Sequence, residues 1–399
     1  MAREHVPRNK RRVARMLRMI RRLRSAEQPV AYRRNRVTLL PDGPRFFQSL
    51  FAAIRSARST ILLEYYLIRN DRTGTALADE LADAVRRGVR VLLIYDYIGC
   101  IETPSNYFKA LNQRGIELLP FNVPSFKRGI HWFDKRDHRK MALIDGTLAF
   151  LGGFNIGDEY AGLTAPPDSF RDLGFSVSGS AVRGLELIFL ETWGMERNEE
   201  LVLPMMRDDE QSRRRRGQAT IVPVSGGPHH RRSYIRNAYL AAIASSSEDV
   251  LIATPYFVPG PRIVRSLLRA VRRGARVRLL LPAKSDVPLV RLVGHSYYTP
   301  LLKAGIEIYE LGAQILHAKV MLIDGERTVI GSANLDQRSF HRNFEINAII
   351  DNRTFGGQIR AVLEADIRNS RQITLEDHER RGGVARLVEK IVNLFGWFL

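Results

Sequence analysis

Two segments of the 399-residue chain carry the same polar residues at the same spacing. In each segment a histidine is followed, at offsets of 2, 7, 14 and 17 positions, by a lysine, an aspartate, a glycine and an asparagine. The two sets are His138, Lys140, Asp145, Gly152 and Asn155, and His317, Lys319, Asp324, Gly331 and Asn334. Chance does not explain two such strings, so the chain contains an internal repeat.

The residue types in this repeat suit phosphoryl chemistry. Residues i and i+2 of a strand point to the same face, so each histidine shares a face with its lysine. The segments 141–144 and 320–323 are apolar and predict buried strands, where a histidine–lysine pair is costly to bury without an anionic partner. Two histidines can supply a nucleophile and a general acid, and two lysines can hold a phosphate.

The elements that must position these residues also repeat. In both halves a predicted amphipathic helix leads into an apolar strand, a second helix and another apolar strand, and Gly88 and Gly274 stand where a helix C-terminal glycine belongs. This alternation predicts an α/β fold whose mostly parallel or mixed sheets are flanked by helices. We expect a first domain at 35–205, a linker or exposed loop at 206–230 and a second domain at 231–375.

The repeated string His-x-Lys-x4-Asp-x6-Gly-Ser/Gly-x-Asn resembles the signature of the phospholipase D superfamily. Surrounding strings such as RDHRKMALIDG, FLGGFNIGDEY and TPYFVP are closer still to bacterial cardiolipin synthases of the short type without transmembrane helices. The resemblance extends from about residue 35 to 375. It implies two pseudo-symmetric domains with the active site at their interface, and a phosphohistidine intermediate.

The same resemblance assigns roles. It implies that His138 is the nucleophile and that His317 is the general acid and then the base. By the same resemblance the phosphate would be held by two lysines and two asparagines: Lys140, Lys319, Asn155 and Asn334. The motif aspartates, Asp145 and Asp324, complete the predicted catalytic set, and we expect them to support the geometry of the site.

Further candidates lie outside the repeated string. In this family a carboxylate orients a motif histidine, and Glu345, 28 residues after His317, fits that role. Asp172 is the expected counterpart in the first half, although either residue could be an ordinary surface carboxylate. Ser332 is a further supporting residue, and Gly153 stands at the equivalent position in the first half, so the two halves are not equivalent.

Composition restricts the partners. The net charge of +20 predicts attraction to nucleic acid or to an anionic membrane surface, or else a well-solvated basic surface. Cys100 is the only cysteine, so an intrachain disulfide is excluded. Apolar runs long enough to span a bilayer are absent from the sequence.

Both ends of the chain have amphipathic patterns. Residues 8–24, within the basic arm at 1–34, predict an interfacial helix on anionic lipid, although a solvated basic arm remains an alternative. Residues 376–399 predict an amphipathic helix that either contacts lipid headgroups or packs on the protein core. We therefore expect a peripheral protein on the cytoplasmic face of the bacterial inner membrane.

These observations lead to one preferred function and two alternatives. We expect a cardiolipin synthase-type phosphatidyltransferase that acts on phosphatidylglycerol and yields cardiolipin and glycerol. A phospholipase D-type hydrolase and a nucleic-acid phosphodiesterase are the alternatives. We expect no metal, no other cofactor, no nucleic-acid partner and no obligate protein partner. The preferred donor and acceptor lipids are left open by the sequence.

Overall fold

The computed structural model describes residues 29–124, 134–197, 201, 203, 217–228 and 233–381. The helices of the first half are α2 (Gly43–Ser56), α3 (Arg72–Arg86), α4 (Ser105–Gln113), α5 (Asp158–Ala161) and α6 (Ala181–Arg197). Its strands are β1 (Tyr32–Leu40), β2 (Thr60–Tyr65), β3 (Arg90–Asp96), β4 (Glu117–Phe121), β5 (Lys140–Ile144), β6 (Leu148–Gly152), β7 (Phe170–Arg171) and β8 (Gly174–Ser178). The helix predicted at 8–24 lies outside the described residues.

The second half repeats this arrangement. Its helices are α8 (Tyr234–Ala244), α9 (Gly260–Arg272), α10 (Pro288–His295), α11 (Tyr298–Lys303), α12 (Gln337–His341), α13 (Arg353–Arg368) and α14 (Leu375–Glu379). Its strands are β9 (Ala219–Gly226), β10 (Asp249–Ala253), β11 (Phe257–Val258), β12 (Arg276–Pro282), β13 (Glu307–Leu311), β14 (Ile315–Leu316), β15 (Val320–Ile323), β16 (Arg327–Gly331), β17 (Leu335–Asp336), β18 (Glu345–Asp351) and β19 (Ser370–Ile373). Of the predicted helix at 376–399 the structure describes residues 376–381, in which α14 ends at Glu379 and a turn follows.

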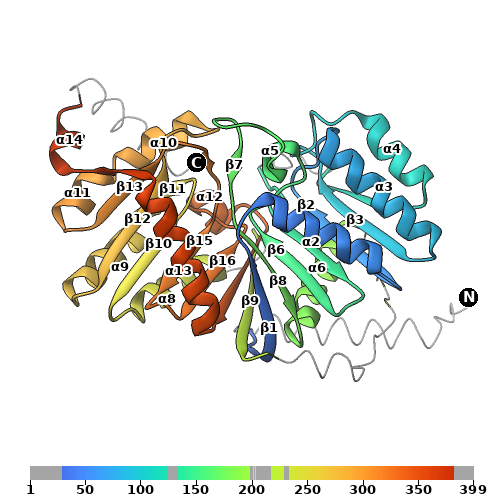
Figure 1. Ribbon diagram of the computed structural model, residues 1–399, viewed down its shortest axis with the longest axis horizontal. Helices are drawn as coiled ribbons and strands as arrows, with labels where there is room; N and C mark the ends of the chain where they lie inside the picture. The colour runs from blue at the N-terminus through green and yellow to red at the C-terminus, as the bar shows by residue number, and fades with distance from the viewer. Residues whose placement is uncertain are drawn as a thin grey trace, which may run out of the picture.

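One mixed sheet of 15 strands runs through both halves, in the order β19-β13-β12-β10-β15-β16-β18-β9-β1-β8-β6-β5-β2-β3-β4. From the β9–β1 junction outward the two halves have the same order, with β10, β12 and β13 corresponding to β2, β3 and β4, except that the second half adds the edge strand β19 beyond β13. Figure 1 shows the halves on either side of these two central strands. The α/β fold with two pseudo-symmetric halves is confirmed.

The junction differs from the prediction at one point. β9 lies within the interval 206–230, for which a linker or exposed loop was predicted, and it pairs with both β18 and β1. Its sequence, ATIVPVSG, is short and carries a proline, so its alternation is a weak strand signal. Residues 219–226 are therefore a central strand, and the linker prediction is wrong for them.

Helices cover both faces of the sheet. On one face each half has a core of its own, formed with α2, α3 and α4 in the first half and with α8, α9 and α11 in the second. On the other face a single core joins strands of both halves with α6 and α13. Because this core is continuous across the β9–β1 junction, it fixes the position of one half of the sheet relative to the other.

Local sequence signals set the helix limits. The carboxylate of Asp71 accepts a hydrogen bond from Gly74 N at the start of α3, a cap that contributes about 1 kcal/mol. Gly88 follows the same helix with φ 87°, and Gly274 follows the equivalent α9 with φ 96°. A side chain is strained in this left-handed region, which explains the glycine at both predicted positions.

Candidate active site

Both histidine–lysine pairs lie where a buried strand begins. Lys140 is the first residue of β5, and Lys319 immediately precedes β15. β5 runs antiparallel to β2, so Lys140 lies opposite Tyr65, at the carboxyl end of β2. Burial leaves the His138 side chain 13% exposed and the His317 side chain 5% exposed. The repeated strands therefore bring all four side chains to one edge of the sheet.

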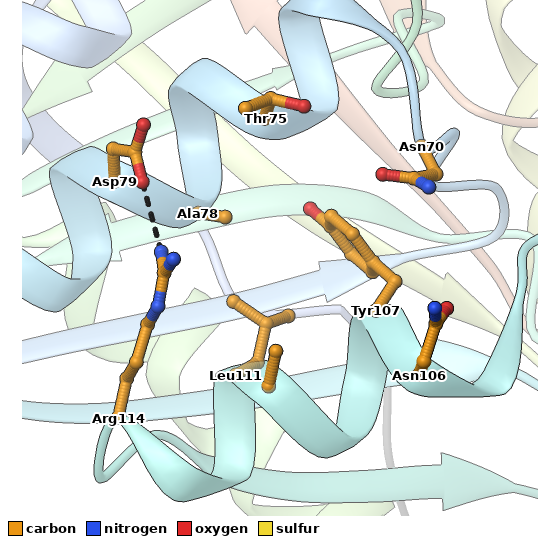
Figure 2. Close-up of a pocket in the computed structure, with 9 residues that line it drawn as sticks. Asn70, Thr75, Ala78, Asp79, Asn106, Tyr107, Leu111 and Arg114 are labelled. Atoms are coloured by element: carbon orange, nitrogen blue, oxygen red, sulfur yellow. Dashed lines mark hydrogen bonds and ion pairs between the residues drawn. The ribbon is translucent and has the colours of Figure 1, made fainter.

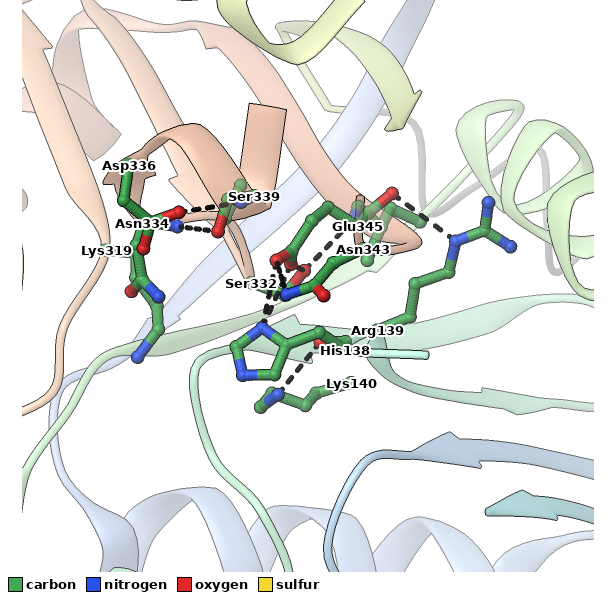
Figure 3. Close-up of polar contacts among 12 residues, drawn as sticks. His138, Arg139, Lys140, Lys319, Ser332, Asn334, Asp336, Ser339, Asn343 and Glu345 are labelled. Atoms are coloured by element: carbon green, nitrogen blue, oxygen red, sulfur yellow. Dashed lines mark hydrogen bonds and ion pairs between the residues drawn. The ribbon is translucent and has the colours of Figure 1, made fainter. Parts of the chain in front are cut away.

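Each histidine is held by a carboxylate from the opposite half. Both carboxylate oxygens of Glu345 lie 3.1 Å from His138 Nδ1, as Figure 3 shows. Asp172 Oδ2 lies 2.6 Å from His317 Nδ1. An ionised carboxylate can only accept, so Nδ1 carries the proton of each ring when its carboxylate partner is ionised, and Nε2 of the neutral ring then keeps its lone pair. The two orienting carboxylates predicted from the sequence thus act crosswise.

Backbone bonds enforce this crossing. His138 N donates to Phe344 O at 2.9 Å, and Phe344 N donates to Arg136 O at 2.8 Å. On the other side, β14 pairs with β7, and His317 N donates to Arg171 O at 2.8 Å. Each histidine segment therefore pairs with the segment that carries the opposite carboxylate, which fixes the distance between ring and carboxylate.

The first half has Gly153 where the second half has Ser332, because the neighbouring carboxylates, Asp172 and Glu345, differ in length. Ser332 Oγ donates to Glu345 Oε2 at 2.5 Å. A Cβ built on Gly153 would lie 2.3 Å from Asp172 Oδ1. The shorter aspartate occupies the space of a side chain at position 153, so this half of the site requires glycine there.

The two histidine–carboxylate pairs differ in electrostatics. Burial raises the pKa of Asp172 to about 7, against the opposing effect of Lys319. Burial also acts to raise the pKa of Glu345, but His138 and Lys140 outweigh it and the pKa of Glu345 is lowered. Burial lowers the pKa of His138, and it lowers that of His317 further, since Lys319 acts in the same direction. Glu345 is therefore ionised at neutral pH, whereas Asp172 is close to its titration point.

The two motif lysines provide positive charge, but without a bound anion both side chains are only partly protonated near neutral pH. Burial lowers the pKa of Lys140 to about 7 and that of Lys319 to about 8. Each ammonium donates to the carbonyl oxygen of its own motif histidine, at 2.8 Å for Lys140 and His138. The positive charges of Lys140 and Lys319 also lower the pKa of both histidines. A bound phosphate would relieve this repulsion.

The motif asparagines also have unfilled hydrogen-bonding capacity. Asn155 Nδ2 donates to the Tyr160 hydroxyl at 2.8 Å, and Asn334 N donates to Ser339 Oγ at 3.2 Å. The Oδ1 atoms of both asparagines are buried and have no hydrogen-bond partner among the described residues. An amide oxygen only accepts and a phosphodiester has no proton to donate, so a phosphate would have to be bound through the Nδ2 groups, and the predicted phosphate-binding role stays a prediction.

Asp145 and Asp324 do not reach this site, and their inclusion in the catalytic set is corrected. They follow β5 and β15 at the ends opposite the lysines, roughly 15 Å away along the strand. Asp145 Oδ1 accepts from Ser59 N and Thr60 N, and Asp324 Oδ1 accepts from Glu248 N and Asp249 N. Both aspartates therefore join a turn to the start of the neighbouring strand.

Arg139 is a supporting residue that the sequence reasoning missed. Its side chain is fully buried and donates to Thr192 Oγ1 at 2.6 Å and, as Figure 3 shows, to the carbonyl oxygen of Glu345 at 3.3 Å. It thereby ties the segment of His138 to the strand that carries Glu345. The second motif has Ala318 at this position, and that difference between the repeats was the available signal.

Asp286 is a second residue that was missed, and it lies near the His317 side of the site. Its carboxylate accepts from the Tyr256 hydroxyl at 2.7 Å. Burial and the positive charge of Lys319 lower the pKa of His317. The negative charge of Asp286 acts in the opposite direction and raises the pKa of His317. An isolated aspartate in a loop gives no sequence signal.

A polar pocket elsewhere in the first half is separate from these residues. It lies between α3 and α4, and Figure 2 shows Asp79 and Arg114 paired across its rim. Its other polar lining residues are Asn70, Thr75, Asn106 and Tyr107. None of these belongs to the predicted site.

Two further findings concern the part of the chain that the structure describes. No group of three or more histidine, cysteine or acidic side chains there is arranged to hold a metal ion. No helix within the described ranges is long and apolar enough to cross a membrane.

Comparisons with known proteins identify similar chains. The family described as "Cardiolipin synthase, PLD-like domain" matches residues 50–164 and 239–367, which contain both motifs and Glu345, whereas Asp172 lies between the two matched segments. A cardiolipin synthase of Geobacillus sp. (strain WCH70) is 36% identical over 359 residues, which cover 89% of this chain and 71% of that protein. Cardiolipin synthase A of Pseudomonas aeruginosa (strain LESB58) is 35% identical over 362 residues, which cover 90% of this chain and 72% of that protein.

Among solved structures, phosphatidylserine synthase from Haemophilus influenzae Rd KW20 is similar, with a TM-score of 0.69 and 12% sequence identity. The match covers 91% of this chain and 95% of that chain. At this identity the likeness shows a shared fold and no more.

Proposed function

The chain belongs to the cardiolipin synthase family of phospholipase D-like proteins, and we propose how its two halves divide the transfer of a phosphatidyl group. It is a phosphatidyltransferase, and phospholipid is its substrate. We propose phosphatidylglycerol as both donor and acceptor, with cardiolipin and glycerol as products. The crosswise pairs of Glu345 with His138 and of Asp172 with His317 carry this proposal.

His138 acts as the nucleophile in the first step. Glu345 is ionised and accepts from Nδ1, so the Nε2 lone pair of the neutral ring attacks the phosphorus of the donor lipid. A P–N bond forms as the P–O bond to the glycerol headgroup breaks. Glu345 also stabilises the positive charge that develops on the ring, as the carboxylate of a catalytic triad does.

His317 supplies the proton that glycerol needs to leave. Burial raises the pKa of Asp172 to about 7, so the Asp172–His317 pair can hold an extra proton near neutral pH although the pKa of His317 alone is lowered. That proton passes from His317 Nε2 to the leaving oxygen, and glycerol departs as an alcohol. The pair thus acts as the general acid, and afterwards as the base.

The second step reverses these roles. A hydroxyl of the acceptor phosphatidylglycerol gives its proton to His317 and attacks the phosphorus, and the P–N bond to His138 breaks. Lys140 and Lys319 hold the non-bridging oxygens through both steps, and Asn155 and Asn334 complete the phosphate contacts. Water in place of the lipid hydroxyl would give phosphatidic acid, the hydrolytic outcome.

Rapid quenching of the purified protein with phosphatidylglycerol tests the mechanism. We expect a phosphatidyl adduct on the peptide that contains His138, detected by mass spectrometry under alkaline conditions, and no adduct in His138→Ala. His317→Ala lacks both the acid of the first step and the base of the second, so the adduct should form slowly in this variant and, once formed, should persist. An adduct on His317 would reverse the assignment, and product formation without any adduct would contradict it.

A substrate panel tests the reaction class. Cardiolipin and glycerol should form in a one-to-one ratio from phosphatidylglycerol vesicles, whereas single- and double-stranded DNA should stay intact. His138-dependent cleavage of DNA without lipid turnover would favour the phosphodiesterase alternative.

We further propose that the protein is peripheral to the cytoplasmic face of the bacterial inner membrane. The net charge of +20 and the basic sequence of residues 8–24 support attraction to an anionic lipid surface. The proposed reaction requires neither nucleic acid nor an obligate protein partner.

A further inference from the structure

Asp286 lies at the edge of the sheet where the catalytic residues gather, although the proposed reaction does not use it. β12 runs parallel to β10, with Leu280 opposite Ala253, so the carboxyl ends of both strands lie at one edge. β15 runs antiparallel to β10, so Lys319 and His317, which precede β15, lie at the same edge. Asp286 belongs to the loop between β12 and α10. This loop therefore begins beside the general acid and base.

The charge of Asp286 acts on the catalytic side chains of the second half. Burial lowers the pKa of Lys319, and the charges of Asp172 and then Asp286 oppose this effect. Asp286 also opposes the lowering of the pKa of His317. A carboxylate in this position repels a phosphate, which needs positive charge around it. Asp286 therefore suits a part of the substrate that is uncharged and can donate a hydrogen bond.

A half-buried tyrosine holds this carboxylate in place. The Tyr256 hydroxyl donates to Asp286 Oδ2 at 2.7 Å, and the tyrosine ring packs against a small apolar cluster of β11 and α10. Asp286 Oδ1 is contacted by Ser285 Oγ alone, at the long distance of 3.4 Å. Asp286 has no ion pair among the residues that the structure describes. The carboxylate is thus oriented through one oxygen, and its other oxygen can accept from a ligand.

The corresponding acidic residues of the first half are paired with arginines. β3 corresponds to β12, and the loop after β3 carries Glu102, whose carboxylate lies 2.7 Å from Arg69 Nη1. Asp96, the last residue of β3, lies 3.1 Å from Arg136 Nη1. In the proposed reaction an alcohol leaves and another enters on the His317 side, whereas the His138 side bonds to phosphorus. The unpaired carboxylate is therefore on the side where hydroxyl groups must be bound.

We propose that Asp286, held by Tyr256, binds the hydroxyl next to the reacting one in the glycerol headgroup of the acceptor phospholipid. The inference rests on the proposed function, in which this headgroup enters beside His317. The neighbouring hydroxyl donates to Asp286 Oδ1 while the reacting hydroxyl gives its proton to His317. Val287 and Leu289 are 37% and 47% exposed, so the same loop offers an apolar surface to the acyl chains of a lipid acceptor. Asp286 thereby selects a vicinal diol over water and over simple alcohols.

The ratio of transfer to hydrolysis tests this role. In Asp286→Asn the Tyr256 hydroxyl would still donate to the amide oxygen, so the NH₂ group would face the acceptor hydroxyl in place of an oxygen. With phosphatidylglycerol vesicles, we expect the ratio of cardiolipin to phosphatidic acid to fall roughly tenfold, because a hydrogen bond to a charged group is lost and water needs no second hydroxyl. Tyr256→Phe should lower the ratio in the same direction. Glu102→Gln, the matched change in the first half, should leave it unchanged.

A competition between two small alcohols separates binding of the acceptor from electrostatic support of Lys319. Propane-1,2-diol and 1-propanol are added together at equal concentrations, and their phosphatidyl products are measured by mass spectrometry. Both alcohols react with the same intermediate, so changes in its rate of formation or in the amount of folded protein cancel in the product ratio. The wild-type chain should favour the diol, and Asp286→Asn should lose most of this preference.

The outcomes distinguish the proposal from its alternatives. Equal loss of both alcohol products in Asp286→Asn, at an unchanged ratio, would assign Asp286 to the charge of Lys319 and overturn the proposal, as would a wild-type chain without preference. A lower preference for the diol with an unchanged ratio of cardiolipin to phosphatidic acid would assign the site to free polyols and refute the lipid acceptor. Absence of the His138 adduct would count against the proposed function, whereas unchanged ratios beside a normal adduct would count against this inference alone.

Discussion

Replacing Glu345 with glutamine removes the negative charge behind His138 and keeps the length of the side chain. Glu345 is completely buried, and both of its oxygens lie 3.1 Å from His138 Nδ1. A hydrogen bond that involves a charged group contributes about 1.5–3 kcal/mol, and about 1.4 kcal/mol corresponds to a factor of ten in rate. We therefore expect kcat/KM for phosphatidylglycerol to fall roughly 10- to 100-fold.

The substitution also has a cost in the folded state. Ser332 Oγ donates to Glu345 Oε2 at 2.5 Å, and Asn343 Nδ2 donates to Oε1 at 3.3 Å. A glutamine presents one oxygen and one NH₂ group, so one of these donors loses its acceptor, which costs about 1–3 kcal/mol. The melting temperature must be measured together with the rate, so that a loss of folded protein is not mistaken for a lower catalytic rate.

Asp145→Asn is the matched control, since it makes the same chemical change in a carboxylate of the motif that does not reach the site. Initial rates on phosphatidylglycerol vesicles, with products measured by mass spectrometry, compare the two variants at a temperature where both are folded. We expect Asp145→Asn to lower the melting temperature and to leave kcat/KM near that of the wild-type chain. Wild-type turnover in Glu345→Gln, or an equal loss in folded Asp145→Asn, would refute the reasoning.

The remaining predictions concern the histidines, the pH profile and the amino terminus. His138→Ala and His317→Ala should each remove nearly all turnover, because the two residues act as one unit; retention of activity in either would contradict the shared site. The pKa values of Lys140 and Lys319 are lowered to about 7 and about 8, so kcat/KM should fall as the pH rises through about 8 and the lysines lose charge; an unchanged rate up to pH 10 would contradict this. Deleting residues 1–28 should weaken flotation with phosphatidylglycerol vesicles and reduce its dependence on salt, because each basic residue near anionic lipid contributes about 1 kcal/mol before screening. Unchanged flotation across a salt series would mean that the arm is only solvated charge.

The sequence by itself determined the fold class and predicted the candidate catalytic residues. The spacing of His138 and Lys140 predicted that the two residues share a strand face, which is a local relation, although β5 begins only at Lys140 and His138 lies just before it. The alternation of helices and apolar strands predicted the α/β fold for the same reason, because periodicity is a local property. The internal repeat then predicted two related halves without any knowledge of how they pack.

Tertiary structure decided which residues meet. Glu345 is 207 positions from His138, and Asp172 is 145 positions from His317, so no local pattern could show that each carboxylate serves the opposite half. The same holds for Asp145, whose place in the motif suggested a catalytic role but whose strand carries it to the far end of the sheet. Such contacts depend on the order of the strands in the sheet and on how the two halves pack across the β9–β1 junction. The spacing of residues along the chain does not encode this packing.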